Sequence, residues 1–244
     1  MRVLVTRPRP AADVLAAALR ACGATVEVCP ALHITPRALN DAQLANIENA
    51  DCFVFISVNA VRFGWRPVAS RAGVPDVRWC AVGPATARAL TAHGVAVIAP
   101  PAPGSGAALL ALATMQSMCD QRVVIVRGVG GLETLSTVLA VRGARVDSLE
   151  VYERTLSPVD TLADALAAGF DVIVVSSGEC LAAVLAAADF GGARAALTVA
   201  TVVVPSPRVL GQARQAGLSR VVLSAGADDA AVLAAVQTIR GHNG

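Results

Sequence analysis

The stretch VLVTRPRPAADVLAAALRACGATVEV, residues 3–28, decides the fold class, and its pattern returns along the chain. It opens with a short apolar run that is typical of a buried strand. An Ala- and Leu-rich run over 11–21 then predicts a helix that ends near Gly23, because glycine commonly terminates helices. A second strand is expected over 25–29, stopped by Pro30. Strand, helix and strand in this order predict a parallel β-α-β unit.

The same alternation continues to the end of the chain. Further strands are expected over 52–56, 79–82, 95–99, 122–127, 145–151, 171–175, 197–204 and 220–223. Further helices are expected from residue 59 onward and over 85–92, 106–115, 132–141, 179–187, 208–216 and 229–239. Strands that alternate with helices of about ten residues predict an α/β architecture in which helices cover both faces of parallel sheets.

The chain also contains an internal duplication. Residues 3–28 are matched by VVIVRGVGGLETLSTVLAVRGARVDS at 123–148, FVFISVNAV at 53–61 by VIVVSSGEC at 172–180, and 81–98 by 202–223. A spacing of about 120 residues is too long for a solenoid repeat and indicates two copies of a domain. Two similar α/β lobes predict a cleft between them, where small ligands commonly bind.

The composition excludes several classes of function. Of 244 residues, 55% are hydrophobic and 16% are charged, which predicts a globular chain with room for two cores. Every basic residue is Arg, so Schiff-base chemistry and a Walker lysine are excluded. The net charge of +2 and the scattered Arg residues predict no nucleic-acid partner. The N-terminus does not resemble a signal peptide and no apolar run reaches membrane-spanning length, so a cytoplasmic protein without a membrane partner is expected.

The six cysteines form no C-x-x-C pair, and most lie within apolar runs. Buried, reduced thiols are therefore expected, and no metal or cofactor. A metal site formed by Cys22, Cys29 and His33 is the alternative.

Small, hydroxyl-bearing or Gly-rich residues follow the expected strands and open the helices. The loops are Thr6-Arg7-Pro8, Ser57-Val58-Asn59, Gly83-Pro84-Ala85-Thr86, Arg127-Gly128-Val129-Gly130-Gly131, Ser176-Ser177-Gly178 and Pro205-Ser206-Pro207-Arg208. In doubly wound sheets the loops at the carboxyl ends of strands bind ligands, and helix N-termini attract anions. The loops together predict an anionic ligand, although each hydroxyl alone is more typical of an ordinary helix cap.

The sequence gives little support for other kinds of catalytic site. The Gly-rich loop does not fit G-x-G-x-x-G, so a dinucleotide site is not expected. The three histidines lie in a connection (His33), at a helix end where the terminal carbonyls are expected to contact the ring (His93), and in the C-terminal tail (His242). They suggest no Ser–His–Asp site. Asp228 and Asp229 are expected to cap the last helix.

Tyr152 is the only tyrosine of the chain and lies at the end of an expected strand. Its side chain either packs in the core or points its hydroxyl into the cleft as a proton donor. A phenol with the usual tyrosine pKa near 10 is protonated at neutral pH, which suits an acid better than a base.

The motifs VLVTRP, SVNAVRF, AVGPATARAL, VRGVGGLETLSTVLAVRGARVDSLEVYER, DVIVVSSGE and VVVPSPR, in this order and spacing, resemble the uroporphyrinogen-III synthase family over residues 2 to about 240. The resemblance implies two flavodoxin-like lobes joined by a two-stranded linker. The first lobe would hold residues 1–35 and 156–244, the second residues 38–150, with linkers at about 30–38 and 150–158. Sequence repeat and lobe would then not coincide.

The resemblance also implies the reaction. The substrate would be hydroxymethylbilane, a linear tetrapyrrole with eight carboxylates, which loses water and closes with inversion of ring D, without a cofactor. The family's tyrosine matches Tyr152 as the proton donor. Candidates for substrate contact are Thr6, Arg7, Ser57, Asn59, Thr86, Gly128, Ser176, Ser177 and Ser206. The chain departs from the family at Leu132, where an Arg often stands, and this weakens the case for that loop.

Two other interpretations compete with a monomeric synthase. A non-catalytic two-lobed protein that binds or senses a small anion would use the same loops, because fold alone does not choose a function. A dehydrogenase-like enzyme is the third interpretation, and it would require nucleotide binding.

Overall fold

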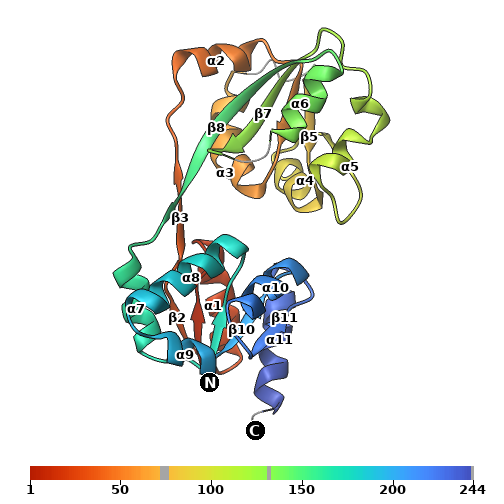
Figure 1. Cartoon of the computed structure of the whole chain (residues 1–244). Coiled ribbons are helices and arrows are strands. Elements are labelled where there is room, and N and C mark those ends of the chain that lie inside the picture. The colour runs from red at the N-terminus through yellow and green to blue at the C-terminus, as the bar shows by residue number, and fades with distance from the viewer. Residues whose placement is uncertain (72–76, 131–132, 243–244) are drawn as a thin grey trace. The chain divides into compact units, whose positions relative to one another are not determined.

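The computed structural model describes residues 1–71, 77–130 and 133–242, and the chain forms two compact units. Unit 1 comprises Met1–Ile34 and Thr155–Gly244, and unit 2 comprises Thr35–Arg154. The chain passes from unit 1 to unit 2 within strand β3 (Leu32–Pro36) and returns within strand β8 (Arg145–Leu156), as Figure 1 shows. Each unit therefore contains residues from both halves of the sequence.

Unit 1 is built on a five-stranded parallel sheet in the order β11-β10-β9-β1-β2. The strands are β1 (Arg2–Val5), β2 (Thr25–Val28), β9 (Val172–Val174), β10 (Thr201–Val204) and β11 (Val221–Leu223). The helices are α1 (Ala11–Ala21), α7 (Val159–Ala167), α8 (Gly178–Phe190), α9 (Arg194–Val199), α10 (Pro207–Gln215) and α11 (Asp229–His242).

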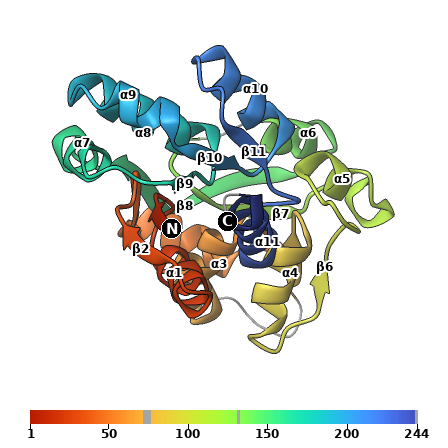
Figure 2. The same ribbon diagram turned by 90° about the horizontal axis from the view of Figure 1, so that it is seen from below.

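Alternating side chains along these strands form two apolar layers. Val3 and Val5 pack with α1 and α11 on one face, whereas Leu4 packs with α7, α8 and α9 on the other. Figure 2 shows α1 and α11 on one side of the sheet and α8, α9 and α10 on the other. The near-continuous Val and Ile content of the strands follows from burial on both faces.

Unit 2 is built on a sheet in the order β3-β8-β7-β4-β5-β6. Its remaining strands are β4 (Cys52–Phe55), β5 (Arg78–Ala81), β6 (Val97–Ile98) and β7 (Arg122–Gly128). Its helices are α2 (Asp41–Glu48), α3 (Val58–Ala69), α4 (Pro84–Thr91), α5 (Gly106–Leu110), the 3-10 turn η1 (Ala113–Met115) and α6 (Thr134–Val141). Val54 and Ile125 face α5, η1 and α6, whereas Trp79, on the opposite face, contacts Trp65 of α3.

The two sheets place duplicated segments at the same positions. Written from its other edge, the strand order of unit 1 is β2-β1-β9-β10-β11, which is the flavodoxin-like order. The strand order of unit 2 without β3 is β8-β7-β4-β5-β6. Matched segments of the duplication occupy matched places, so unit 2 is a circular permutation of unit 1 in chain order. An equivalent hydrogen bond occurs in each unit. Asp171 Oδ2 accepts from the Arg2 N–H in unit 1, and Asp51 Oδ2 accepts from the Arg122 N–H in unit 2, each at 2.7 Å.

Several expected elements differ in the structure. The strand expected over 197–204 is wrong in its first part, because 194–199 form α9, whose Leu197 packs in the core beside α8, and β10 begins at Thr201. The helix expected over 106–115 is interrupted and consists of α5 and η1. Helices α2 and α7 were not expected. Asn40 and Gln43 form a capping box, which is a sequence signal for the start of α2. Gly131 and Leu132 lie outside the described residues.

No helix within the described part of the chain is both long and apolar enough to cross a membrane.

Candidate active site

The loops at the carboxyl ends of the strands carry the residues selected from the sequence. Three of the serines cap the helices that follow them. Ser57 Oγ accepts from the Ala60 N–H at 3.0 Å, Ser177 Oγ from Cys180 at 3.1 Å, and Ser206 Oγ from Val209 at 3.4 Å. Each cap occupies one N–H of its helix and leaves the neighbouring N–H groups of the first turn directed out of the helix end.

In unit 1, Thr6 is completely buried, and its hydroxyl donates to the Val174 carbonyl at 2.8 Å. Cys180 lies beside it, because its thiol donates to the Thr6 carbonyl at 3.2 Å and accepts from Ser176 Oγ at 3.6 Å. These contacts bring Thr6, Ser176 and Ser177 together at the ends of β1 and β9. The hydroxyl of Thr6 is already used inside the protein, so this residue shapes the loop.

The two arginines at the ends of β1 and β7 point into the protein. Arg7 is 7% exposed, pairs with Asp229 and donates to the Ala227 carbonyl at 2.6 Å. Arg127 is 4% exposed, pairs with Glu133 at 3.0 Å and donates to the Gly130 carbonyl at 2.8 Å. Both side chains thus hold neighbouring loops in place.

Arg127 Nε is buried without a hydrogen-bond partner among the described residues. A hydrogen bond from Ser136, with the charge and hydrogen bond of Arg127, holds the pKa of Glu133 below its usual value. The carboxylate of Glu133 is therefore the ionised partner that neutralises the buried guanidinium.

Tyr152 lies within β8, opposite Gly128, the last residue of β7, and is 6% exposed. The strand expected over 145–151 is longer than predicted, because β8 continues to Leu156 beside β3. Its hydroxyl lies 3.1 Å from Ser57 Oγ, and its ring contacts Phe63 of α3 with ring centroids 5.9 Å apart. The ring lies directly over Gly128, since a Cβ built at Gly128 would be 2.5 Å from the ring atom Cε2. Phe63 was not selected from the sequence, although it lies in the SVNAVRF motif.

The other residues selected from the sequence divide between the units. Asn59 is half-buried in the first turn of α3, and Thr86 is buried near the start of α4, both in unit 2. Ser206 caps α10 in unit 1, and the neighbouring Arg208 is exposed. A Cβ at Gly178 would lie 3.3 Å from Arg208 Nη1, so this guanidinium lies beside the N-terminus of α8.

Four of the six cysteines are buried and all six are free thiols. Burial, assisted by the charge of Glu27, raises the pKa of Cys29, so this side chain stays a neutral thiol. Within the described residues, no group of three or more His, Cys, Asp and Glu side chains is arranged to hold a metal ion.

The contact expected for His93 is corrected by the structure. Its ring stacks on Trp65, with centroids 4.5 Å apart and an interplanar angle of 12°, because α3 and α4 pack side by side on the same face of the sheet. Asp228 caps α11 as expected, since its carboxylate accepts from the Ala231 N–H at 2.9 Å. The side chain of His242 lies outside the described residues.

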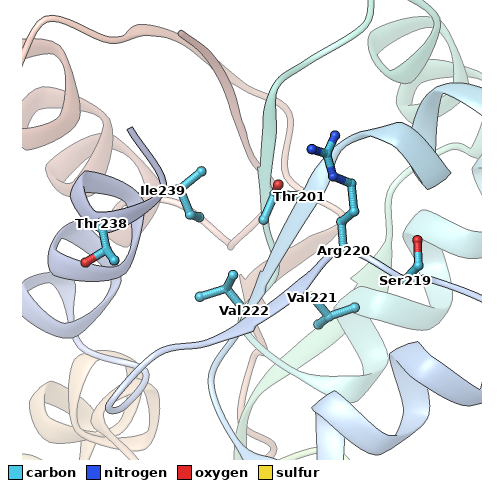
Figure 3. A pocket seen from close by; sticks show the side chains of 7 residues that line it. All are labelled: Thr201, Ser219, Arg220, Val221, Val222, Thr238 and Ile239. Carbon is cyan, nitrogen blue, oxygen red and sulfur yellow. The ribbon is translucent and has the colours of Figure 1, made fainter. Parts of the chain in front are cut away.

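A hollow of about 420 Å³ lies at the opposite end of the unit 1 sheet. Figure 3 shows its lining side chains, which come from the start of β10, from β11 with the residues before it, and from α11: Thr201, Ser219, Arg220, Val221, Val222, Thr238 and Ile239. Thr201 is the first residue of β10, so this hollow faces the amino ends of the strands. It is separate from the loops that carry the candidate residues.

Comparisons with known proteins converge on one family. A family model described as Uroporphyrinogen-III synthase HemD matches residues 13–234. Uroporphyrinogen-III synthase of Salmonella typhimurium LT2 is 31% identical over 246 residues, covering 97% of this chain and 100% of that protein. The Escherichia coli K12 enzyme of the same name is 31% identical over 251 residues with the same coverage.

Solved structures of proteins with this name share the fold. A mutant uroporphyrinogen III synthase from the extremely thermophilic bacterium Thermus thermophilus matches with a TM-score of 0.67 and 18% identity over 99% of both chains. The Helicobacter pylori 26695 enzyme matches with a TM-score of 0.62 and 16% identity, over 98% of this chain and 100% of that one. At these identities the structures support the two-sheet α/β fold alone.

Proposed function

Because the chain belongs to the uroporphyrinogen-III synthase family, an enzyme family of tetrapyrrole and haem biosynthesis, we propose that it converts hydroxymethylbilane into uroporphyrinogen III, with Tyr152 as the proton donor. The observation that carries the proposal is the position of the only tyrosine. Its hydroxyl lies at the carboxyl edge of the unit 2 sheet, 3.1 Å from Ser57 Oγ. Ligands of doubly wound sheets bind at this edge.

The proton balance of the reaction suits a phenol. The terminal hydroxyl of the substrate leaves as water when the C–O bond breaks and Tyr152 supplies the proton. The substituted carbon of ring D then attacks the carbocation, which is stabilised by the pyrrole nitrogen, and the new bond forms the spiro intermediate. The bond from this carbon to the methylene group of ring C then breaks, and the free α-carbon of ring D attacks that methylene group and closes the macrocycle. Loss of one proton from this α-carbon restores the pyrrole and reprotonates the phenolate. The net change is the loss of one water molecule.

The hydrogen bonds around Ser57 favour this use of Tyr152. Ser57 Oγ accepts from the Ala60 N–H at 3.0 Å, and its own proton can point to the Tyr152 oxygen. The phenol proton is then free for the leaving group. A phenolate that forms as the proton leaves would accept a hydrogen bond from Ser57, near the positive end of the α3 dipole.

The carboxylates of the substrate are proposed to bind at helix N-termini. In unit 1 the candidates are Ser176, Ser177 and Ser206, with Arg208, whose guanidinium lies beside the first turn of α8. In unit 2 they are Ser57 and Asn59. Thr6, Arg7 and Thr86 are buried, and we propose that they support these loops from within. Backbone N–H groups at helix N-termini and an exposed guanidinium both suit a polycarboxylate.

The remaining parts of the proposal rest on the sequence and the family resemblance. They are catalysis without a cofactor, a monomeric state, a cytoplasmic location, and the assignment of units 1 and 2 as the two lobes of the family with linkers near 30–38 and 150–158.

An isomer assay tests the proposed function. Freshly prepared hydroxymethylbilane is incubated with the protein, the products are oxidised, and the two porphyrin isomers are separated. A predominance of isomer III over the spontaneous isomer I is expected. Isomer I alone, at the uncatalysed rate and with folded protein, would contradict the proposal and favour a non-catalytic anion-binding module.

A further inference from the structure

We propose that Gly128 is a positioning residue that holds the ring of Tyr152 in the orientation in which its hydroxyl meets Ser57. The inference rests on the proposed role of Tyr152 and explains how the fold orients this side chain. It gives Gly128 a task other than contact with the substrate, because the face of Gly128 is covered by the Tyr152 ring.

The orientation begins with an irregularity in β8. Arg127 of β7 pairs with Glu150, but the next residue, Gly128, pairs with Tyr152, so Val151 is an extra residue in β8. In a regular strand, residues two apart point to the same face. The bulge breaks this rule between Glu150 and Tyr152 and turns Tyr152 to the face on which Gly128 lies.

That face is the one covered by α3. A Cβ at Gly64 of α3 would lie 2.5 Å from Val126 Cγ1 and 3.3 Å from the methyl groups of Val151. Val126 precedes Gly128 by two residues on β7 and shares its face. The helix therefore approaches the sheet closely here, which brings Ser57 and Phe63, both on α3 or at its cap, against the Tyr152 side chain.

Gly128 supplies the space for the ring. A Cβ at this position would lie 2.5, 2.6 and 3.0 Å from ring atoms Cε2, Cζ and Cδ2. The φ of Gly128 is not among the positive glycine values, so its backbone would accept alanine without strain. The three atoms nearest to an added methyl group all belong to the ring, so the ring is the group that it displaces first. Because Phe63 borders the ring, the ring must turn, and the hydroxyl carried by Cζ leaves its position beside Ser57.

The test compares Gly128→Ala with a matched variant, Gly106→Ala, whose Cβ would meet nothing within 4 Å in the same unit. We expect Gly128→Ala to lower kcat at least about tenfold, since an error of about 1 Å in a reacting group can cost a hundredfold. Gly106→Ala should stay within about twofold of the wild type. The same two changes are then made in a Tyr152→Phe background. A second loss from Gly128→Ala in that background would show that the glycine acts through something other than the phenol and would overturn the proposal.

A spectroscopic measurement separates positioning from general damage. Tyrosine labelled with ¹³C at Cζ gives one NMR signal, because Tyr152 is the only tyrosine. Gly128→Ala should shift this signal and Gly106→Ala should not. An unshifted signal in Gly128→Ala would refute the positioning role.

If Gly128→Ala does not fold, the contact between Gly128 and Tyr152 is tested by NMR on the wild-type protein. Strong nuclear Overhauser effects are expected between the Gly128 α-protons and the Tyr152 ring, and their absence would overturn the proposal. If Tyr152→Phe retains full turnover, the proton-donor assignment fails, and with it the catalytic consequence of the positioning. The ring signals would still report whether Gly128 holds the side chain.

Discussion

Replacement of Tyr152 by phenylalanine removes one oxygen atom and separates catalysis from packing. The ring keeps its contacts with Phe63 and Gly128, so no cavity forms. The substitution removes the 3.1 Å hydrogen bond to Ser57, and Ser57 keeps the N–H of Ala60 as a partner. A neutral hydrogen bond of this kind contributes about 1 kcal/mol, so we expect a loss of stability of about that size.

The effect on turnover should be larger than the effect on stability. Loss of the proton donor is expected to lower kcat at least tenfold, which corresponds to about 1.4 kcal/mol or more of barrier. General acid catalysis contributes about 10² to 10⁴ in rate, so a hundredfold loss would also agree with this role. KM should change little, because the phenol acts in the transition state. The assay is the initial rate of isomer III formation, with isomer I measured as the spontaneous background.

Ser57→Ala is the matched control, because it removes the same hydrogen bond and keeps the phenol. It should lose a similar amount of stability, plus part of a helix cap of about 1 kcal/mol, and retain more activity than Tyr152→Phe. Wild-type turnover in Tyr152→Phe would refute the proton-donor role. Equal losses of activity in both variants would contradict a contribution of the phenol proton beyond the contributions of Ser57 and of the hydrogen bond between the two side chains.

Three further predictions concern other parts of the chain. Gly64→Ala should destabilise the protein by about 1–3 kcal/mol in urea unfolding, because the new Cβ would lie 2.5 Å from Val126 Cγ1. Gly211→Ala is the control and should not destabilise the protein, because a Cβ at this position of α10 would meet open space. Arg208→Gln should raise KM severalfold with kcat nearly unchanged, and an unchanged KM would remove Arg208 from the site. The pKa of Glu133 is lowered, so its stabilising contribution is present above its ordinary pKa of 4.5 and is lost as the pH falls through the lowered value. Glu133→Gln should therefore be less stable than the wild type at pH 7, and the difference should shrink at acidic pH; a constant difference would contradict the assignment.

Local pattern was enough to predict the α/β class and the loops that carry the candidate residues. The first strand, helix and strand appear in the structure as β1, α1 and β2, and the three serines that open helices cap them. These features depend on neighbours within a few residues, so periodicity and capping preferences reveal them. The pattern misled at 197–199, where β-branched residues favoured a strand and packing of Leu197 against α8 favoured a helix.

The sequence by itself determined that the chain is a duplicated α/β protein with one tyrosine, on a strand that was expected to end at 151 and continues to Leu156. Local pattern could not predict that each sheet takes strands from both copies, which only the family resemblance implied. Only the tertiary structure decided that Val151 bulges and turns Tyr152 onto Gly128, and that Arg7 and Arg127 point inward to acidic partners. These features depend on which distant strands pair and in which register. A shift of one residue in the pairing register moves a side chain to the other face of the sheet without changing the local sequence pattern. Contacts between distant segments therefore decide the register.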